Sequence, residues 1–174
     1  MQDGSHLSEQ EIKVAALEEM RFHFVFNSLN SIRYMIHRDQ ELAYSMVQDL
    51  GIFMRGQLDT ILSHDMIHLP QELKCARAYA MLEKVQSCHM EVDWRCSCTE
   101  GYVRPGAVCS AVEAVIKRYI RGASGKKTLV VEEISGWCRA VRIRVAEEGE
   151  ESEVLVGVAD SMESLEAPES RDMP

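Results

Sequence analysis

The stretch Met20-Arg21-Phe22-His23-Phe24-Val25-Phe26-Asn27-Ser28-Leu29-Asn30-Ser31-Ile32 decides the fold of the first half of this 174-residue chain. Spacings of three and four residues define one face of a helix, and here they predict an apolar stripe of Phe22, Val25, Leu29, Ile32 and Ile36. The neighbouring face is polar, with His23, Asn27, Asn30, Tyr34 and His37. We therefore expect a helix that is anchored by its apolar stripe and presents His23 at an accessible edge; an ordinary core helix with a surface histidine has the same spacing.

The surrounding sequence extends this helix and adds a second one. Ser8 with Glu11 three residues later forms a capping box, and Leu7 can staple against Ile12, so the first helix is predicted from Ser8 to about Arg38. Asp39 is expected to cap a second helix. Its predicted apolar stripe is Ala43, Val47, Leu50, Met54, Leu58 and Ile61.

Two long helices joined by so short a link are expected to form an antiparallel hairpin. A hairpin has only two apolar stripes, so we expect two chains to combine into a four-helix bundle, which makes the protein a homodimer. Gly51 and Gly56 are expected to mark a close approach or a bend in the second helix.

The second half of the chain has a different periodicity. Pro70 begins a third helix that reaches about Ser87, after a polar turn from Ser63 to His68. A loop from Gly101 to Gly106 and a helix from Ala107 to Arg121 are predicted next. Four strands are predicted from alternating residues, at Met90–Cys96, Thr128–Ile134, Cys138–Ala146 and Glu153–Val158. The fold class is thus α+β, with the helical bundle followed by a small α/β sandwich in which a helix lies against a mixed sheet.

Composition narrows the possible partners and divides the chain into four parts. The net charge of −9 argues against a nucleic-acid partner, and no apolar run is long enough to span a bilayer, so we expect a cytoplasmic protein that binds other proteins. Six scattered cysteines are expected to be free thiols, and no metal site is predicted. The expected parts are 1–7, disordered or a tag remnant; 8–88, a helical dimerisation domain; 89–159, a small α/β domain; and 160–174, an acidic tail.

His23-Phe24-Val25-Phe26-Asn27-Ser28-Leu29-Asn30-Ser31-Ile32 resembles the phosphoacceptor motif of the LytS-type sensor histidine kinases, except that Phe22 stands where a proline normally precedes the histidine. The stretch from Leu50 to Leu58, with Arg55, resembles the second helix of that family. Leu69-Pro70-Gln71-Glu72-Leu73, with Tyr79 and Glu83, resembles the segment before its ATPase domain. The resemblance covers roughly residues 17–92, and it implies that His23 is the phosphorylated residue.

The second half is similar in layout to the family's ATP-binding domain, but the residues that hold nucleotide are altered. Glu113-Ala114-Val115 stands where the family has Glu-Asn-Ala, and a methyl group cannot ligate magnesium. The adenine-binding aspartate motif aligns with Glu147-Glu148-Gly149 in one register and with Val158-Ala159-Asp160-Ser161 in another. Glu113 and Asp160 are the candidate remnants of the ATP site. No cofactor is expected, and ATP with magnesium would bind only if the degenerate site still functions.

A phosphoacceptor helix joined to a degenerate ATPase-like module is similar to histidine phosphotransferases of the sporulation phosphotransferase B type. The resemblance implies a two-component phosphorelay protein that passes a phosphoryl group through His23 between receiver-domain aspartates of response regulators. Asn27 would orient the histidine ring, and Asn30, Tyr34 and His37 would dock the partner. Two alternatives stay open: a non-catalytic pseudokinase that acts as a dimeric docking module, and a truncated piece of an ATP-dependent sensor kinase, which would autophosphorylate.

Overall fold

A computed structural model describes residues 9–63, 65–87, 89–135, 138–147 and 150–161. These residues form four α-helices and two sheets, which confirms the α+β class. The chain divides into two compact units, residues 1–47 and 48–174, and each is considered by itself. The predicted capping box at Ser8, the N-terminal remnant and the tail beyond Ser161 lie outside the described residues.

The first unit contains α1 (Glu9–Met35), a turn, and the beginning of α2 (Gln40–Leu62). The backbone N–H of Asp39 donates to the carbonyl of Met35 at 2.8 Å, which closes the turn after α1. The Asp39 carboxylate accepts the N–H of Leu42 at 3.0 Å, which confirms the predicted cap of α2.

Within the single chain, most of the apolar stripe predicted for α1 is exposed rather than buried. Phe22, Leu29 and Ile36 are 75%, 52% and 45% exposed, and only Ile32 of the predicted set is buried. The buried line is instead Phe24, Ser28 and Ile32, at a spacing of four residues. Ser28 fits among apolar neighbours because its hydroxyl donates to the Phe24 carbonyl at 2.9 Å. Both faces of this stretch are apolar, so periodicity alone did not distinguish the face that is buried within one chain.

The same shift occurs in α2. Ala43 is buried as predicted, but Val47, Met54, Leu58 and Ile61 are 54%, 42%, 54% and 61% exposed. Met46 and Phe53 are buried together with Ala43, and these two residues lie on the helix face next to the predicted stripe. Each helix therefore leaves an apolar line exposed on the single chain.

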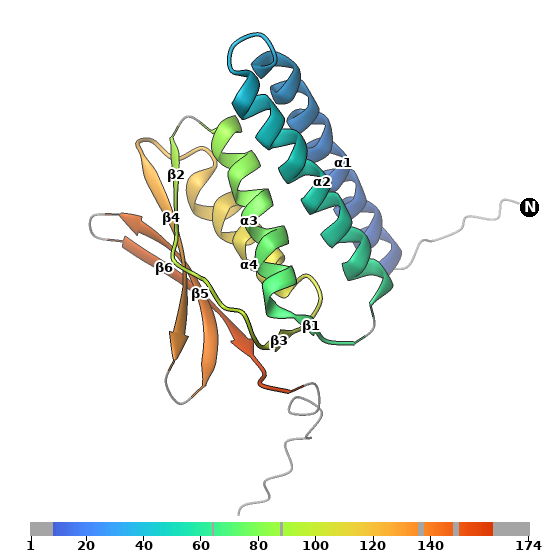
Figure 1. The fold of residues 1–174 in the computed structure, drawn as a ribbon, viewed down its shortest axis with the longest axis vertical. Helices are drawn as coiled ribbons and strands as arrows, with labels where there is room; N and C mark the ends of the chain where they lie inside the picture. The colour runs from blue at the N-terminus through green and yellow to red at the C-terminus, as the bar shows by residue number, and fades with distance from the viewer. Residues whose placement is uncertain (1–8, 64, 88, 136–137, 148–149, 162–174) are drawn as a thin grey trace, which may run out of the picture. The chain divides into compact units, whose positions relative to one another are not determined.

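The second unit is built around a four-stranded sheet in the order β2-β4-β5-β6. Strand β2 runs parallel to β4, and the remaining pairs are antiparallel. Helices α3 and α4 pack against one face of this sheet (Figure 1). The elements after α2 are β1 (Ile67–His68), α3 (Leu69–Gln86), β2 (Met90–Trp94), β3 (Tyr102–Val103), α4 (Ala107–Val115), η1 (Ile116–Ile120), β4 (Lys127–Ser135), β5 (Arg139–Glu147) and β6 (Glu150–Val158).

Three details of this unit differ from expectation. The loop after Gly101 contains β3, which pairs with β1, because both short segments are extended and lie side by side. The helix predicted from Ala107 to Arg121 changes at Ile116 into one π-helical turn, which buries Ile120 and leaves Tyr119 37% exposed. The strand predicted to Cys96 ends at Trp94.

Two glutamate side chains of α3 bind the start of α4 and the end of η1. The N-terminus of α4 lacks a cap of its own, because Gly106 has a φ of 77° and no side chain. Buried Glu72 takes its place by accepting the backbone N–H groups of Gly106 and Cys109 at 3.2 and 3.0 Å. Further along α3, buried Glu83 pairs with Arg121 at the end of η1. These contacts join α3 to α4 and η1 by charge-assisted hydrogen bonds.

Candidate functional site

His23 lies on the exposed surface of α1, with its ring held from one side only. The side-chain amide nitrogen of Asn27, one turn along the helix, lies 3.2 Å from the ring nitrogen Nδ1 of His23. The adjacent Phe24 is buried and fixes this part of the helix. The Asn27 amide thus contacts the imidazole at Nδ1 and leaves the opposite nitrogen Nε2 outside this contact, and its role in orienting the ring stays a prediction.

The contact with Asn27 is compatible with either neutral tautomer of the His23 ring. With the amide nitrogen facing the ring, Asn27 donates to Nδ1, and the neutral ring carries its proton on Nε2. A half-turn of the amide brings Oδ1 to the same place, where it accepts a hydrogen bond from Nδ1–H and leaves the Nε2 lone pair available. The pair can thus hold His23 in the tautomer in which Nε2 acts as a nucleophile.

The remaining polar residues of the predicted line also lie at the surface of α1 and the turn after it. Asn30 and His37 are exposed, and Tyr34 is 52% exposed, with the guanidinium of Arg38 stacked 4.2 Å from its ring centroid. Their role in partner docking stays a prediction. Sequence reasoning assigned Phe22 to the apolar stripe and gave Phe26 no role, whereas the two side chains are 75% and 69% exposed.

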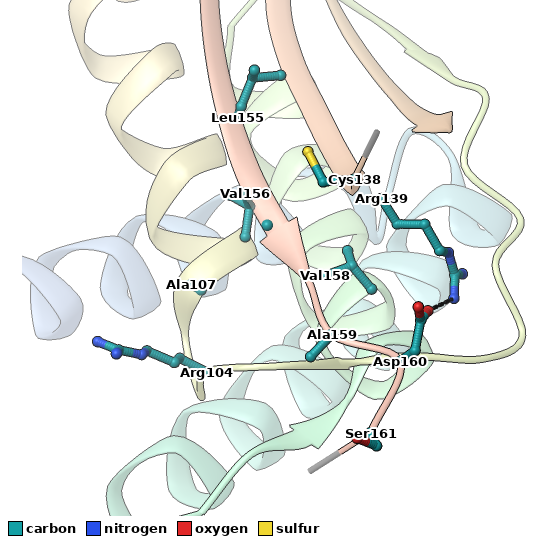
Figure 2. A pocket seen from close by; sticks show the side chains of 11 residues that line it. Arg104, Ala107, Cys138, Arg139, Leu155, Val156, Val158, Ala159, Asp160 and Ser161 are labelled. Atoms are coloured by element: carbon teal, nitrogen blue, oxygen red, sulfur yellow. Dashed lines mark hydrogen bonds and ion pairs between the residues drawn. The ribbon is translucent and has the colours of Figure 1, made fainter. Parts of the chain in front are cut away.

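A separate pocket of about 750 Å³ lies in the second unit, beside the end of β6 and the start of β5. Its charged lining residues are Arg104, Arg139 and Asp160, and its apolar walls come chiefly from β6. Figure 2 shows Arg139 reaching Asp160 on one side of the pocket, whereas Arg104 extends on the other side. The Arg139 guanidinium donates to Asp160 at 3.1 Å and to Glu133 at 3.0 Å.

The two predicted remnants of the ATP site are not brought together in this pocket. Asp160 lines it, but its carboxylate is 81% exposed and paired with Arg139. Glu113 is not a lining residue, and it forms an ion pair with Lys117 on the next turn of its helix. Ala114 beside it is exposed and offers no oxygen ligand. The loss of ATP and magnesium binding that was expected from these positions stays a prediction.

Arg139 and Arg104 are residues that sequence reasoning missed. Arg139 reaches Asp160 because it lies opposite Val158 in the β5–β6 pairing, a register that no local motif encodes. Tyr79 and Glu83, in contrast, were noted from the resemblance, and they meet: the Tyr79 hydroxyl donates to the Glu83 carboxylate at 2.9 Å. Burial first, and then the charge of Glu83, raise the pKa of Tyr79, so this hydroxyl stays protonated.

The model of the histidine kinase family matches residues 13–89, the segment that contains His23 and Asn27. The match supports the assignment of this segment to a sensor histidine kinase family. Over 80 residues the chain is 35% identical to the sensor histidine kinase BtsS of Escherichia coli strain K12. The aligned segment is 46% of this chain and 14% of that protein. Over 147 residues the chain is 27% identical to the sensor histidine kinase/phosphatase LytS of Staphylococcus aureus. This aligned segment is 83% of this chain and 25% of that protein.

These similarities support a role in two-component signalling. The chain spans no more than a quarter of the length of the two relatives. Among the described residues, no helix has the length and apolar character needed to cross a membrane. Within those same residues, no three histidine, cysteine or carboxylate side chains are grouped so that they could hold a metal ion.

Proposed function

We propose that this protein is a histidine phosphotransferase of a two-component phosphorelay, in which His23 accepts a phosphoryl group from one receiver aspartate and passes it to another. The observation that carries this proposal is the exposed His23 ring, held at Nδ1 by Asn27 on a helix anchored by Phe24. The match of this segment to histidine kinases supports the choice of His23.

In the proposed step, the Nε2 lone pair of His23 attacks the phosphorus of a phospho-aspartate on a response-regulator receiver. The bond between phosphorus and the aspartate oxygen breaks, and the aspartate leaves as a carboxylate. An N–P bond forms, and the ring loses the Nδ1 proton to solvent. The reverse reaction with a second receiver aspartate completes the relay. The receiver would supply the magnesium ion, so no metal ligand is required from this chain.

The altered nucleotide positions favour a donor other than ATP. Glu113 is paired with Lys117, Ala114 replaces an oxygen ligand, and Asp160 is paired with Arg139. An autokinase would need these positions to hold the triphosphate and its magnesium. A phosphorylated receiver carries its own phosphoryl group and has no such requirement.

The test is transfer from a phosphorylated receiver, with two histidine variants compared. Wild-type protein should become labelled, whereas His23→Gln should not. His89→Gln is the matched control, because His89 is also an exposed histidine but is not among the predicted docking residues, so this variant should keep full labelling. Equal labelling of wild type and His23→Gln would refute the assignment of His23.

A docking module without phosphoryl chemistry is the second candidate, and the two exposed phenylalanines favour it. Phe22 replaces the proline of the family motif, and together with Phe26 it places bare aromatic surface beside His23. Aromatic side chains are enriched where proteins bind one another. In this case His23→Gln would bind a receiver as tightly as wild type and neither protein would be labelled, whereas Phe22→Ser would weaken binding.

An ATP-dependent kinase fragment is the third reading, and nucleotide addition separates it from the other two. Under our proposal, millimolar ATP with magnesium should leave the melting temperature unchanged. A stabilisation above about 1 kcal/mol would indicate a working nucleotide site and would contradict the proposed loss of ATP binding.

Self-association is part of the same proposal. The exposed lines on α1 (Phe22, Leu29, Ile36) and on α2 (Val47, Met54, Leu58, Ile61) are the apolar surfaces that a four-helix bundle of two chains would cover. Sedimentation should give twice the monomer mass, and Leu58→Glu should shift the protein to monomer. A monomeric wild type at micromolar concentration would contradict the predicted dimer.

A further inference from the structure

Two buried cysteines in the second unit face each other across the contact between α3 and α4. The sulfur atoms of Cys75 on α3 and Cys109 on α4 lie 4.0 Å apart, and each residue is only 3% exposed. Both are free thiols. A third helix contributes Gln57, whose side-chain nitrogen lies 3.6 Å from the Cys109 sulfur and 4.0 Å from the Cys75 sulfur.

We propose that Cys75 and Cys109 form a peroxide-sensitive dithiol site, in which oxidation creates a disulfide that links α3 to α4. The sulfurs are already in contact through an S–H···S hydrogen bond, and a covalent bond requires them to approach to about 2.05 Å. The two thiols come from different helices, so the product would be a crosslink within the packed core of this unit. The proposal is independent of phosphotransfer by His23.

The oxidation is a two-step reaction with hydrogen peroxide. The Cys75 thiolate attacks one peroxide oxygen, the O–O bond breaks, and Cys75 becomes a sulfenic acid while hydroxide leaves and takes up a proton to become water. The Cys109 sulfur then attacks the sulfenic sulfur, the S–O bond breaks, and a second water leaves with the Cys109 proton. In total, two thiols lose two electrons and two protons, and one peroxide is reduced to two waters.

The surroundings distinguish Cys75 as the attacking residue. The hydrogen bond between the two thiols lowers the pKa of Cys75, and the Gln57 amide adds to this effect. The pKa of Cys109 is raised, because its proton is held by Cys75 and its thiol is buried. Cys98 is a poor competitor, since burial and the neighbouring Glu133 raise its pKa to about 12.

Gln57 provides the route by which a small oxidant reaches the pair. Gln57 is only half-buried, and its side-chain nitrogen touches both sulfurs. Its carbonyl oxygen Oε1 is buried and has no hydrogen-bond partner among the residues that the structure describes. Leaving such an oxygen unpaired costs about 1–3 kcal/mol, so rotation of this side chain away from the pair has a small net cost. Peroxide is small enough to enter where the amide has been.

The test is peptide mapping of the full protein after treatment with hydrogen peroxide. Free thiols are blocked first, and digestion without reductant should then release a peptide that joins Cys75 to Cys109. The intact mass should fall by about 2 Da, and dithiothreitol should restore both thiols. Cys75→Ala and Cys109→Ala should each abolish this peptide, whereas Cys138→Ala should not, because Cys138 is exposed and outside the pair.

Gln57→Ala supplies a kinetic readout that does not depend on removing a thiol. Opening the route beside the sulfurs should increase the rate of disulfide formation several-fold, because the gain in access outweighs the small contribution of Gln57 to the lowered pKa of Cys75. A control at Gln71, which bonds Asp59 at 2.8 Å and touches neither cysteine, should leave the rate unchanged when it is replaced by alanine. The proposal is overturned if wild-type Cys75 and Cys109 remain fully reduced while exposed Cys138 is oxidised, or if the disulfide that forms joins other cysteines.

Discussion

Replacing Asn27 tests whether the orientation of the His23 ring matters for phosphoryl transfer. The amide–imidazole contact is a single 3.2 Å hydrogen bond at the surface of α1. A bond of this kind contributes about 0.5–1.5 kcal/mol net. If the whole amount is lost from the transition state, the rate falls about two- to twelvefold, since 1.36 kcal/mol corresponds to a factor of ten. Asn27→Ala should therefore slow transfer without abolishing it.

Two further variants show whether the effect is specific. Asn27→Asp keeps an acceptor for an Nδ1 proton and holds the Nε2 lone pair free, so it should transfer at least as fast as wild type. Asn30→Ala removes a neighbouring exposed amide that is predicted to contribute only to docking, so it should leave the transfer rate unchanged when the phosphorylated receiver is saturating. The assay is single-turnover transfer from an excess of phosphorylated receiver to each variant, followed by the labelled histidine.

The result that would refute this reasoning is an equal rate for Asn27→Ala and Asn30→Ala. Such a result would mean that the contact orients the free ring but has no part in transfer. A severe loss in Asn27→Asp would show instead that the amide must donate to Nδ1, which is the tautomer opposite to the one we infer. Circular dichroism and melting curves confirm that each variant is folded before rates are compared.

The other predictions concern stability. Gly56→Ala should lower the melting temperature, because the added Cβ would lie 2.7 Å from a side-chain carbon of α3 and overpacking costs about 1–3 kcal/mol. Gly51→Ala should raise the melting temperature, because the nearest atom to its added Cβ is 3.8 Å away and alanine stabilises a helix by about 1 kcal/mol relative to glycine. Tyr79→Phe should cost about 1.5–3 kcal/mol in chemical denaturation, because the lost bond is to the charged Glu83; a neutral result would show that the pair contributes nothing net. Burial raises the pKa of Glu72 above its ordinary 4.5, so the stability advantage of wild type over Glu72→Gln should be largest below that pH and shrink as pH rises; an advantage that grows with pH would contradict this assignment.

Local sequence patterns predicted the helix starts well where a residue type has one strong structural preference, such as a cap or a first turn. Asp39 was expected to cap α2 and does, and Pro70 lies in the first turn of α3. The close approach expected at Gly56 is also present, because any larger side chain would collide with Cys75. These features depend on the conformation of a few neighbouring residues, and the sequence contains that information directly.

Features that depend on distant contacts were not predictable in the same way. The spacing of Phe22, Phe24 and Phe26 offers two apolar faces, and the choice between them is made by the rest of the unit rather than by the helix itself. The π-helical turn that begins at Ile116 leaves no mark in the sequence pattern, because the apolar spacing fits an ordinary helix equally well. His23 was identified by resemblance, but its contact with Asn27 also follows from the four-residue spacing of the helix.

The contacts from α3 to α4 and η1 determine how this protein can be divided into fragments. A fragment that begins at residue 89 would retain α4 without the Glu72 carboxylate that accepts its first N–H groups, and Arg121 without Glu83. The α/β layer alone should therefore express as an unstable polypeptide, whereas a fragment that begins before α3 keeps both acceptors. A stable sheet with its covering helix thus requires α3, which makes α3 an obligatory part of the second half rather than a connector to it.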